Sequence, residues 1–504
     1  MSRNRILQVL FFVYCLMVAF TLWQHEMWRD ELEVWNIATA SKSLYDLFHN
    51  FRYEGHPALW FILVWLLSKI SRAPEVMQMA NFMFAAITTH FILFKSPFSA
   101  IQKVLLVFGY YFLYEYAAIS RNYMIEVMMV VMICSMWGNT AKNFWWLLFL
   151  LFMICQTNVY GYLFSISFSF ALFIACLSDR KFLWPKASAF LFVAAFGFAV
   201  AYITSAPPPD SEIYLPIHIS FDYQRFIQTF TNSWNAFIPI PRFQFPFWSE
   251  PWLRPSLAGS VLGISLLLVI LISYSGKIKL LLTFLIPAIL LMLALQYFKY
   301  PGFQRHYGHL FIAFVAFLWM KDAKEQTAEE NFSRVKFSLF NLILLIQFFI
   351  GISFVIADWI FPFSNGKQTA QYIGRNYPAT TTVAGYTDCP AITIAGYLRR
   401  DVYFLNNLRD ASFVVYRTGR LAVEDSDITR NLFTLADSSK LLVAALNLKL
   451  QLNEKTFLPG AGNDTVISFR IHQAEKSFLI KNKMHFEGGM VGGENFTVYE
   501  IREE

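Results

Sequence analysis

Continuous apolar segments recur along this chain from residue 6 to residue 358. They lie near 6–23, 57–70, 76–94, 103–119, 122–138, 143–156, 159–177, 187–204, 257–275, 278–297, 306–320 and 336–358. A helix needs about 20 mostly apolar residues to cross a bilayer, whereas a membrane barrel shows short alternating segments. Only 15% of the 504 residues are charged, against about 25% in soluble domains. The pattern excludes a soluble enzyme, a disordered chain and an outer-membrane barrel. It predicts an all-α polytopic membrane domain of about 11–13 transmembrane helices.

Two long stretches, 24–56 and 205–256, interrupt the apolar series, and the composition becomes polar after Phe361. We therefore predict a transmembrane domain over 1–361 and a soluble α/β domain over 362–504. Within the second domain the patterns predict helices at 366–376, 391–398 and 425–436, and strands at 381–387, 402–405, 412–417, 441–446 and 496–501. The glycine pairs at 488–489 and 492–493 precede a strand and no helix, which favours a loop or hairpin over a phosphate-binding loop.

Basic residues orient the membrane domain, because cytoplasmic junctions carry the excess of lysine and arginine. Here they gather at alternate junctions: Lys95 and Lys103, Lys142, Arg180 with Lys181 and Lys186, Lys277 and Lys279, and the stretch from Lys321 to Lys336. We expect 24–56, 205–256, the junctions near 120 and 299–305, and the C-terminal domain on the outer face. Arg3 and Arg5 place the N-terminus on the cytoplasmic side, so the segments 57–70 and 76–94 should together cross the membrane only once. Because 57–70 is short for a full span, the sequence leaves open how these two segments cross. No small-residue cleavage site follows 6–23, so we predict an uncleaved first span.

The net charge, the cysteines and the metal-binding patterns give no indication of a nucleic-acid partner or a metal site. The net charge of +7 fits basic loops facing an anionic leaflet better than nucleic acid. Four of the five cysteines lie in apolar segments, and Cys389 is left without a disulfide partner in its domain. Neither an HExxH pattern nor a CxxC pair is present, so the sequence indicates no metal site.

The first outward stretch carries two adjacent carboxylates, Asp30 and Glu31, within Trp-Arg-Asp-Glu, and it ends with Glu54-Gly55-His56-Pro57. Carboxylates near a bilayer are costly to desolvate, and one held in a partly apolar setting has a raised pKa suited to a general base. The alternative is a solvated helix with ordinary surface acids.

Two further motifs lie at predicted outward junctions, Ser120-Arg121-Asn122-Tyr123 and Gln304-Arg305-His306-Tyr307. Arginine on the outer face opposes the positive-inside bias, and an anionic head group or phosphate would explain it. The alternative for Arg121 is an ion pair with Glu126, and for Arg305 and Tyr307 it is anchoring at the membrane interface.

Together these motifs resemble those of membrane glycosyltransferases of the GT-C fold, the class that includes protein O-mannosyltransferases and aminoarabinose transferases (glycosyltransferase family 39-like in bacteria). Asp30-Glu31 is similar to the Asp-Glu pair of their first outward loop, and Gly55-His56-Pro57-Ala58-Leu59 to a Gly-His-Pro-Pro-Leu-type motif. Ser120-Arg121-Asn122-Tyr123 keeps the Arg and Tyr of an Ala-Arg-Pro-Tyr-type motif, and Arg305 with Tyr307 is similar to a later Arg-Tyr motif. The resemblance covers roughly residues 1–320.

The resemblance implies inverting transfer of a sugar from a polyprenyl-phosphate donor to a hydroxyl of a lipopolysaccharide, glycan or protein acceptor, at the outer face of the bacterial inner membrane. In that scheme Asp30 is the general base and Glu31 positions a substrate. Arg121 and Arg305 stabilise the leaving phosphate, and the remaining candidates, which bind substrate, are Glu54, His56, Tyr123 and Tyr307. The scheme requires neither a cofactor nor a metal. A transporter or flippase of lipid-linked glycans, the alternative function, predicts midplane charges and internal repeats, neither of which the sequence shows. A structural scaffold would not need Asp30, Arg121 and Arg305 on one face.

Overall fold

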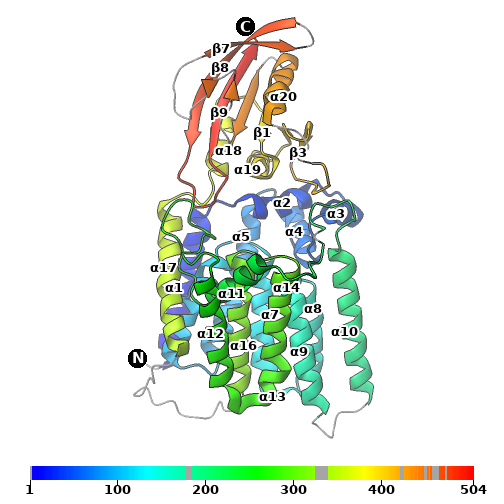
Figure 1. Ribbon diagram of the computed structural model, residues 1–504, viewed down its shortest axis with the longest axis vertical. Coiled ribbons are helices and arrows are strands. Elements are labelled where there is room, and N and C mark those ends of the chain that lie inside the picture. The colour runs from blue at the N-terminus through cyan, green and yellow to red at the C-terminus, as the bar shows by residue number, and fades with distance from the viewer. Residues whose placement is uncertain are drawn as a thin grey trace.

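The structure is a computed structural model of the chain. It describes residues 3–177, 184–214, 216–323, 339–420, 425–439, 441–447, 451–452, 455–456, 465–471 and 474–503. A bundle of helices forms the larger part of the molecule, and an α/β domain stands on one end of it (Figure 1). The predicted fold class, a helical membrane body followed by a C-terminal α/β domain, is confirmed.

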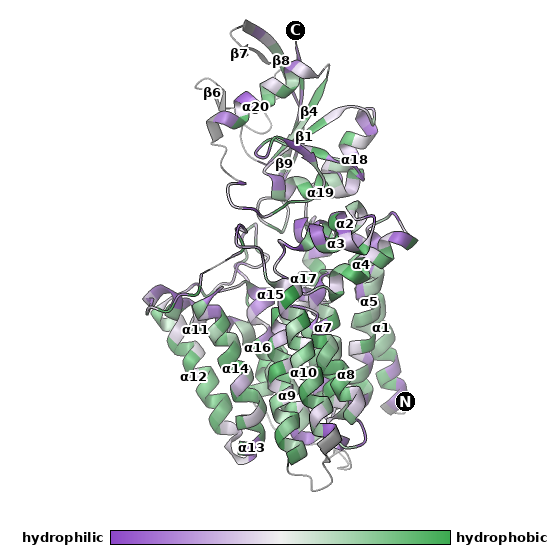
Figure 2. Cartoon of the chain, turned by 90° about the vertical axis from the view of Figure 1, so that its right-hand side faces the viewer, coloured by the Kyte–Doolittle hydropathy of each residue, from purple (hydrophilic) through white to green (hydrophobic). Residues whose placement is uncertain are grey.

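The bundle consists of long apolar helices together with a few short helical segments. They are α1 (Arg3–Gln24), α5 (Glu75–Lys95), α6 (Ala100–Val107), α7 (Asn122–Met136), α8 (Phe144–Cys155), α9 (Val159–Leu177), α10 (Trp184–Ser205), α12 (Leu257–Ser273), α13 (Ile278–Leu280), α14 (Ile286–Phe298), α16 (His309–Asp322) and α17 (Leu339–Ile360), with π-helical turns η1 (Tyr111–Glu115) and η4 (Leu281–Leu285). Among the described residues, six helical stretches are long and apolar enough to cross a membrane, and α4 (Leu59–Ile70), α8 and α12 are shorter apolar helices. Hydrophobic residues predominate along the bundle in Figure 2.

Short helices cover the end of the bundle that faces the α/β domain (Figures 1 and 2). They are α2 (Arg29–Ala40), α3 (Leu44–Phe51), α4 (Leu59–Ile70), α11 (Tyr223–Phe237) and α15 (Gln304–Tyr307). Local side-chain caps start two of them. Ser43 Oγ accepts the Asp46 backbone N–H at 3.1 Å before α3, and Asp222 accepts the N–H groups of Gln224 and Arg225 before α11.

The position of α4 shows how the segments 57–70 and 76–94 are arranged, which the sequence left open. It has 12 residues, fewer than the roughly 20 that a full span needs, and both views place it beside α2 and α3. The segment 57–70 therefore stays at this end, and α5 alone returns the chain through the bundle. The apolar residues of α4 pack against α2 and α3, so the short apolar segment at 57–70 is not a separate crossing of the bundle.

The opposite end of the bundle holds the N-terminal end of α1 and the short helix α13, which carries Lys279 (Figure 1). The predicted inward residues Arg180 and Lys181, and the stretch from Lys324 to Lys336, lie outside the described residues.

A mixed seven-stranded sheet forms the core of the α/β domain, in the order β3-β2-β1-β4-β9-β8-β7. β1 (Thr382–Tyr386) runs parallel to β2 (Val402–Phe404) and β4 (Leu442–Leu446), and every other pairing in this sheet is antiparallel. The other elements are α18 (Gly366–Asn376), β3 (Arg409–Ala411), α19 (Asp388–Leu398), α20 (Asp425–Ser438), β7 (Thr465–Ile471), β8 (Ala474–Phe486) and β9 (Phe496–Glu503), with a separate ladder of β5 (Gln451–Leu452) and β6 (Lys455–Thr456).

Most sequence predictions for this domain are confirmed, including all three helices, and the glycine pairs lie in the loop between β8 and β9. The strand predicted at 412–417 is wrong. The strand at this place is β3 (Arg409–Ala411), and the next residues form a loop against α2.

One apolar core joins the α/β domain to the bundle. It includes Leu32 and Trp35 of α2, Phe61 of α4, Ile392 of α19 and Val443 of β4. A Cβ on Gly396 of α19 would lie 3.0–3.1 Å from side-chain atoms of Asn36 and Leu32, so the glycine permits this close helix contact. The domain that follows α17 is therefore packed on the helix that begins with Arg29 and Asp30.

We predict that the two ends of the bundle differ in accessibility from outside the cell. Glu487, whose side chain is 75% exposed in the β8–β9 loop, and Gly276, beside which a Cβ meets nothing within 4 Å, are suitable positions for single cysteines. A membrane-impermeant thiol reagent should label Glu487→Cys in intact cells and Gly276→Cys only after permeabilisation, with the wild-type chain as the background control. The reverse labelling pattern would overturn the predicted orientation.

Candidate active site

The carboxylate of Asp30 lies between two arginines from distant parts of the chain. Arg305 Nη2 is 3.2 Å from Asp30 Oδ2, and Arg121 Nη1 is 3.7 Å from the same oxygen. Arg121 also donates to the backbone carbonyl of Asp30. The Asp30 side chain keeps 24% exposure, while those of the arginines keep only 9–10%. Three of the residues predicted from motifs thus meet at one point, where α2, α7 and α15 begin.

The charges around Asp30 oppose the effect of its burial. Burial favours the neutral acid, but Arg121, Arg305 and Arg29 outweigh it and hold the pKa of Asp30 below its usual range. The sequence had suggested a raised pKa for a carboxylate in a partly apolar setting, and for Asp30 that expectation is wrong. The Asp30 carboxylate is ionised at neutral pH, and the guanidinium groups of Arg121 and Arg305 are its partners.

Aromatic rings enclose the guanidinium of Arg305. Its Cζ lies 5.2 Å from the ring centre of Trp28, 5.4 Å from that of Trp248 and 4.9 Å from that of Phe303. Such cation–π contacts hold a desolvated guanidinium in place. At 8% exposure, Arg305 is not an anchor at the lipid interface, which was the alternative for this residue.

Arg121 is likewise not paired with Glu126, its alternative partner. The Glu126 carboxylate accepts from Asn158 Nδ2 at 2.5 Å and lies 3.1 Å from His309 Nε2, and Glu126 and His309 are fully buried. The negative group beside Arg121 is Asp30.

Glu31 does not share the site of Asp30. Its side chain has 0% exposure, and its oxygens accept the backbone N–H groups of Ser120 at 2.6 Å and Trp28 at 3.2 Å. His25 Nε2 is 3.1 Å from Oε2 of the same carboxylate. All of these contacts of the Glu31 carboxylate are made inside the protein.

The turn before α4 adds two polar groups to the site. Gly55 adopts φ +67°, a conformation that favours glycine and that lets Glu54 and His56 lie close to Arg121 and Asp30. Burial and the nearby Arg121 lower the pKa of His56 to about 3, so the imidazole is neutral. Burial, together with Asp30, raises the pKa of Glu54 to about 8 against the effect of Arg121.

The two tyrosines predicted as binding residues are placed differently. The hydroxyl of Tyr123 lies 2.9 Å from His306 Nε2, and Asp30 and Arg305 are among its charged neighbours. Tyr307 is 2% exposed, and its charged neighbours are Glu115, Glu250 and Arg305. Tyr123 therefore belongs to the Asp30 site, and Tyr307 lies behind it.

Several buried polar atoms at this site have no hydrogen-bond partner among the described residues. They are Arg121 Nε, Arg305 Nε, Trp28 Nε1, His56 Nδ1 and Glu54 Oε1. Buried donors and acceptors are nearly always paired in folded proteins. Unpaired groups converging on a partly buried carboxylate indicate a site built for a polar, negatively charged ligand. Among the described residues no group of three or more His, Cys, Asp or Glu side chains is arranged to hold a metal ion.

Sequence analysis missed several residues that support the site. Arg29 pairs with Glu494 of the β8–β9 loop, with Nη1 3.6 Å from Oε1. The Glu115 carboxylate accepts from the Tyr110 hydroxyl at 2.5 Å and from Trp248 Nε1 at 3.1 Å. It therefore helps to hold the Trp248 ring, one of the three rings around the Arg305 guanidinium. An acidic residue in an apolar segment, such as Glu115, is a signal that the sequence did carry.

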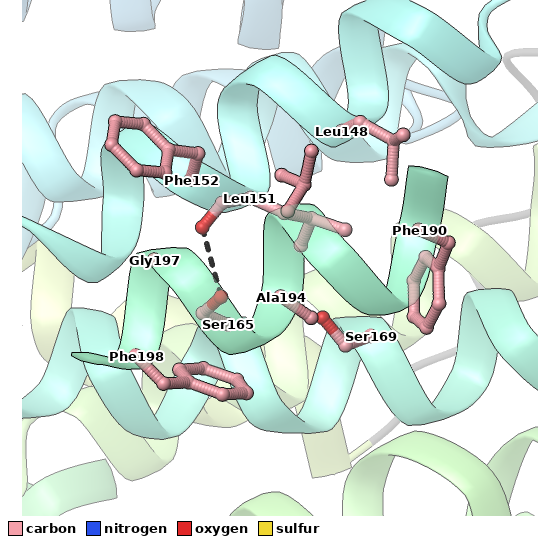
Figure 3. A pocket seen from close by; sticks show the side chains of 10 residues that line it. Leu148, Leu151, Phe152, Ser165, Ser169, Phe190, Ala194, Gly197 and Phe198 are labelled. Carbon is pink, nitrogen blue, oxygen red and sulfur yellow. Dashed lines mark hydrogen bonds between the residues drawn. The ribbon is translucent and has the colours of Figure 1, made fainter. Parts of the chain in front are cut away.

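A separate pocket lies between α8, α9 and α10 (Figure 3). Its lining is apolar apart from two serines, and Ser165 donates its hydroxyl to the Leu151 carbonyl at 2.8 Å. None of its lining residues belongs to the Asp30 site, and none is titratable.

No protein-family model matches the sequence, and no match is found among curated proteins. Comparison with solved structures finds a crystal structure of ArnT from Cupriavidus metallidurans bound to undecaprenyl phosphate. The match covers 88% of this chain and 93% of that chain, at 11% sequence identity and a TM-score of 0.39. At this TM-score the similarity assigns no function to this chain.

The raised pKa of Glu54 predicts a pH dependence of stability. The folded protein holds a proton on Glu54 that the unfolded chain releases near pH 4.5, so stability should fall as the pH rises from about 4.5 to 8. Glu54→Gln lacks this loss, and we expect it to be more stable than wild type at pH 8.5 by about 1–3 kcal/mol and equal at pH 5. Thermal unfolding in detergent at both pH values measures the difference, with the exposed Glu487→Gln as control. Equal pH slopes for Glu54→Gln and wild type would contradict the assignment.

Proposed function

We propose that this protein is a GT-C-type glycosyltransferase that moves a sugar from a polyprenyl-phosphate donor to a hydroxyl of a cell-envelope acceptor. The reaction would take place on the outer face of the bacterial inner membrane. The observation that carries the proposal is the pair of buried guanidinium groups, Arg121 and Arg305, on either side of the partly buried Asp30 carboxylate. The site lies at the end of an apolar bundle, where a lipid-linked donor can present its phosphate while its chain remains in the bilayer.

The chemistry requires one bond to form as another breaks. The acceptor oxygen attacks the anomeric carbon of the sugar, and the bond from that carbon to the phosphate oxygen breaks, with inversion at the carbon. The acceptor proton passes to Asp30, and the phosphate leaves as an anion on its lipid. A positioned base contributes about 10²–10⁴-fold to such a step. Fixed cations stabilise the charge that develops on the leaving oxygen.

Binding of the donor would also change Asp30. In the structure, Arg121 and Arg305 are partners of this carboxylate and keep its pKa low, which makes it a weak base. A phosphate that takes over these guanidinium groups removes the pairing that lowers the pKa. Asp30 would therefore become a stronger base only when the donor is in place.

The other groups of the site fit roles in sugar and acceptor binding. His56 is neutral and has an unpaired ring nitrogen, and Glu54 has an unpaired carboxyl oxygen. Neutral imidazole and carboxyl groups suit the hydroxyls of a sugar. We assign Glu31 to positioning the chain, since its carboxylate is fully occupied by Trp28, Ser120 and His25.

Replacement of Asp30 tests the base. Asp30→Asn keeps the size of the side chain and removes its ability to take a proton, so transfer should fall by about 10²-fold or more. The measurement is release of polyprenyl phosphate from a panel of polyprenyl-phosphate sugars, in membranes that supply the host's own acceptors. The exposed Asp410→Asn of β3 is the matched control and should transfer normally. Turnover near wild type in Asp30→Asn would exclude Asp30 as the base.

Arg121→Lys separates phosphate binding from simple charge pairing. Lysine keeps the charge and loses the planar fork that binds two oxygens at once. We expect a loss of about 1.5–3 kcal/mol, or roughly ten- to a hundredfold in kcat/KM, in the same assay. Arg430→Lys, at a side chain 70% exposed, is the control. Full activity of Arg121→Lys would leave Arg305 as the sole proposed phosphate ligand.

A further inference from the structure

We propose that His25 and Asp358 are positioning residues, which act through the Glu31 carboxylate to set the spacing between Asp30 and Arg121. This inference rests on the proposed function for its catalytic consequence. The contacts themselves involve none of the residues that we place against the substrate.

The three side chains form a continuous buried chain of hydrogen bonds. His25 Nε2 lies 3.1 Å from Glu31 Oε2, and His25 Nδ1 lies 2.7 Å from Asp358 Oδ2. All three side chains have 0% exposure. The carbonyl of His25 accepts from Gln78 Nε2 at 3.2 Å, and the Phe363 ring lies 4.5 Å from the imidazole, so the histidine is fixed from several sides.

Glu31 extends this chain to the two segments that carry the site. Its Oε1 accepts from the Ser120 backbone N–H at 2.6 Å, and Ser120 directly precedes Arg121. Its Oε2 accepts from the Trp28 N–H at 3.2 Å, two residues before Asp30. One carboxylate therefore binds backbone on both sides of the Asp30–Arg121 pair, and its position sets how far apart the two segments lie.

His25 and Asp358 determine where that carboxylate sits. His25 follows the last residue of α1, and Asp358 lies in the last turn of α17, just before the chain enters the α/β domain. We call His25, Glu31 and Asp358 the clamp. It fixes the starts of α2 and α7 relative to the ends of α1 and α17.

The electrostatics favour a charged histidine at the centre of the clamp. Burial opposes protonation, but Asp358 and Glu31 outweigh it and raise the pKa of His25 to about 10. A single imidazolium then lies between two carboxylates, one of which also receives two backbone N–H groups. Removal of one member leaves buried charge without its partner, which is strongly destabilising for the local arrangement.

Small displacements of the clamp residues should change the rate of the transfer step. Misplacement of catalytic groups by about 1 Å costs as much as 10²-fold in rate. Loss of the clamp moves Asp30 relative to Arg121, and this affects the step after binding more than donor binding, because Arg305 keeps its contacts with the rings of Trp248 and Phe303.

The test compares Asp358→Asn, His25→Gln and Glu31→Gln with Asp388→Asn. Asp388 is an equally buried carboxylate, paired with Arg420 at 2.6 Å in the α/β domain, and controls for a general loss of stability. The first readout is amide hydrogen exchange of the folded protein in detergent, which does not depend on any enzymatic activity. Peptides covering Trp28 to Glu31 and Ser120 should exchange faster in the three clamp variants and unchanged in Asp388→Asn. Unchanged exchange of the Ser120 peptide in Asp358→Asn would overturn the clamp.

The second readout is transfer, measured below the unfolding temperature of each variant. Asp358→Asn and His25→Gln should lose about tenfold or more in kcat, with KM for the donor changed much less, and Asp388→Asn should keep kcat. The double variant of Asp358→Asn with Glu31→Gln should lose little more than the worse single variant, since both break one network. Wild-type kcat in the clamp variants despite faster exchange would overturn the catalytic role. If wild type itself transfers no sugar, the proposed function fails, while the exchange data still decide whether the clamp exists.

Discussion

The arrangement of the bundle end beside the α/β domain depends on the hydrogen bonds of the buried Glu31 carboxylate. This carboxylate accepts backbone N–H groups from the segment before α2 and from the segment before α7, and it pairs with His25. A carboxylate without these partners would be costly to bury beside a membrane. Because the partners come from separate helices, satisfying one charge brings together Asp30, Arg121 and the ends of α1 and α17.

The electrostatic character of the site follows from this arrangement. Two adjacent acids, Asp30 and Glu31, have different environments. Asp30 is partly exposed between two arginines, and Glu31 is fully buried among hydrogen-bond donors of the protein. The arginines that lower the pKa of Asp30 also retain unpaired Nε groups. A phosphate that binds these two guanidinium groups would be held by both charges, and Asp30 would lose the pairing that lowers its pKa. In this account the donor itself activates the residue that accepts the proton.

The apolar segments predicted the helical body, and the helix and strand patterns after Phe361 predicted the α/β domain. The basic junctions and the motifs predicted that Asp30, His56, Arg121 and Arg305 meet at one end. The sequence did not predict that Asp30 and Glu31 diverge. Neighbours on a helix point about 100° apart, and only packing decides which of the two faces Arg121. The segment 412–417 looked like a strand because its central residues, 413–416, are all aromatic or β-branched. In the structure its backbone is bound instead by Glu33, which accepts from Val414, and by Asn36, which donates to Ser412. Such long-range partners leave no local signal.

The central claim is that Arg121 and Arg305 bind the phosphate of a lipid donor and thereby free Asp30. The most direct measurement is an electron cryomicroscopy structure of the protein with polyprenyl phosphate bound. The account predicts phosphate density in contact with both guanidinium groups, with Asp30 Oδ2 no longer within 3.2 Å of Arg305. Phosphate bound elsewhere, with the Asp30–Arg305 pair intact, would contradict it.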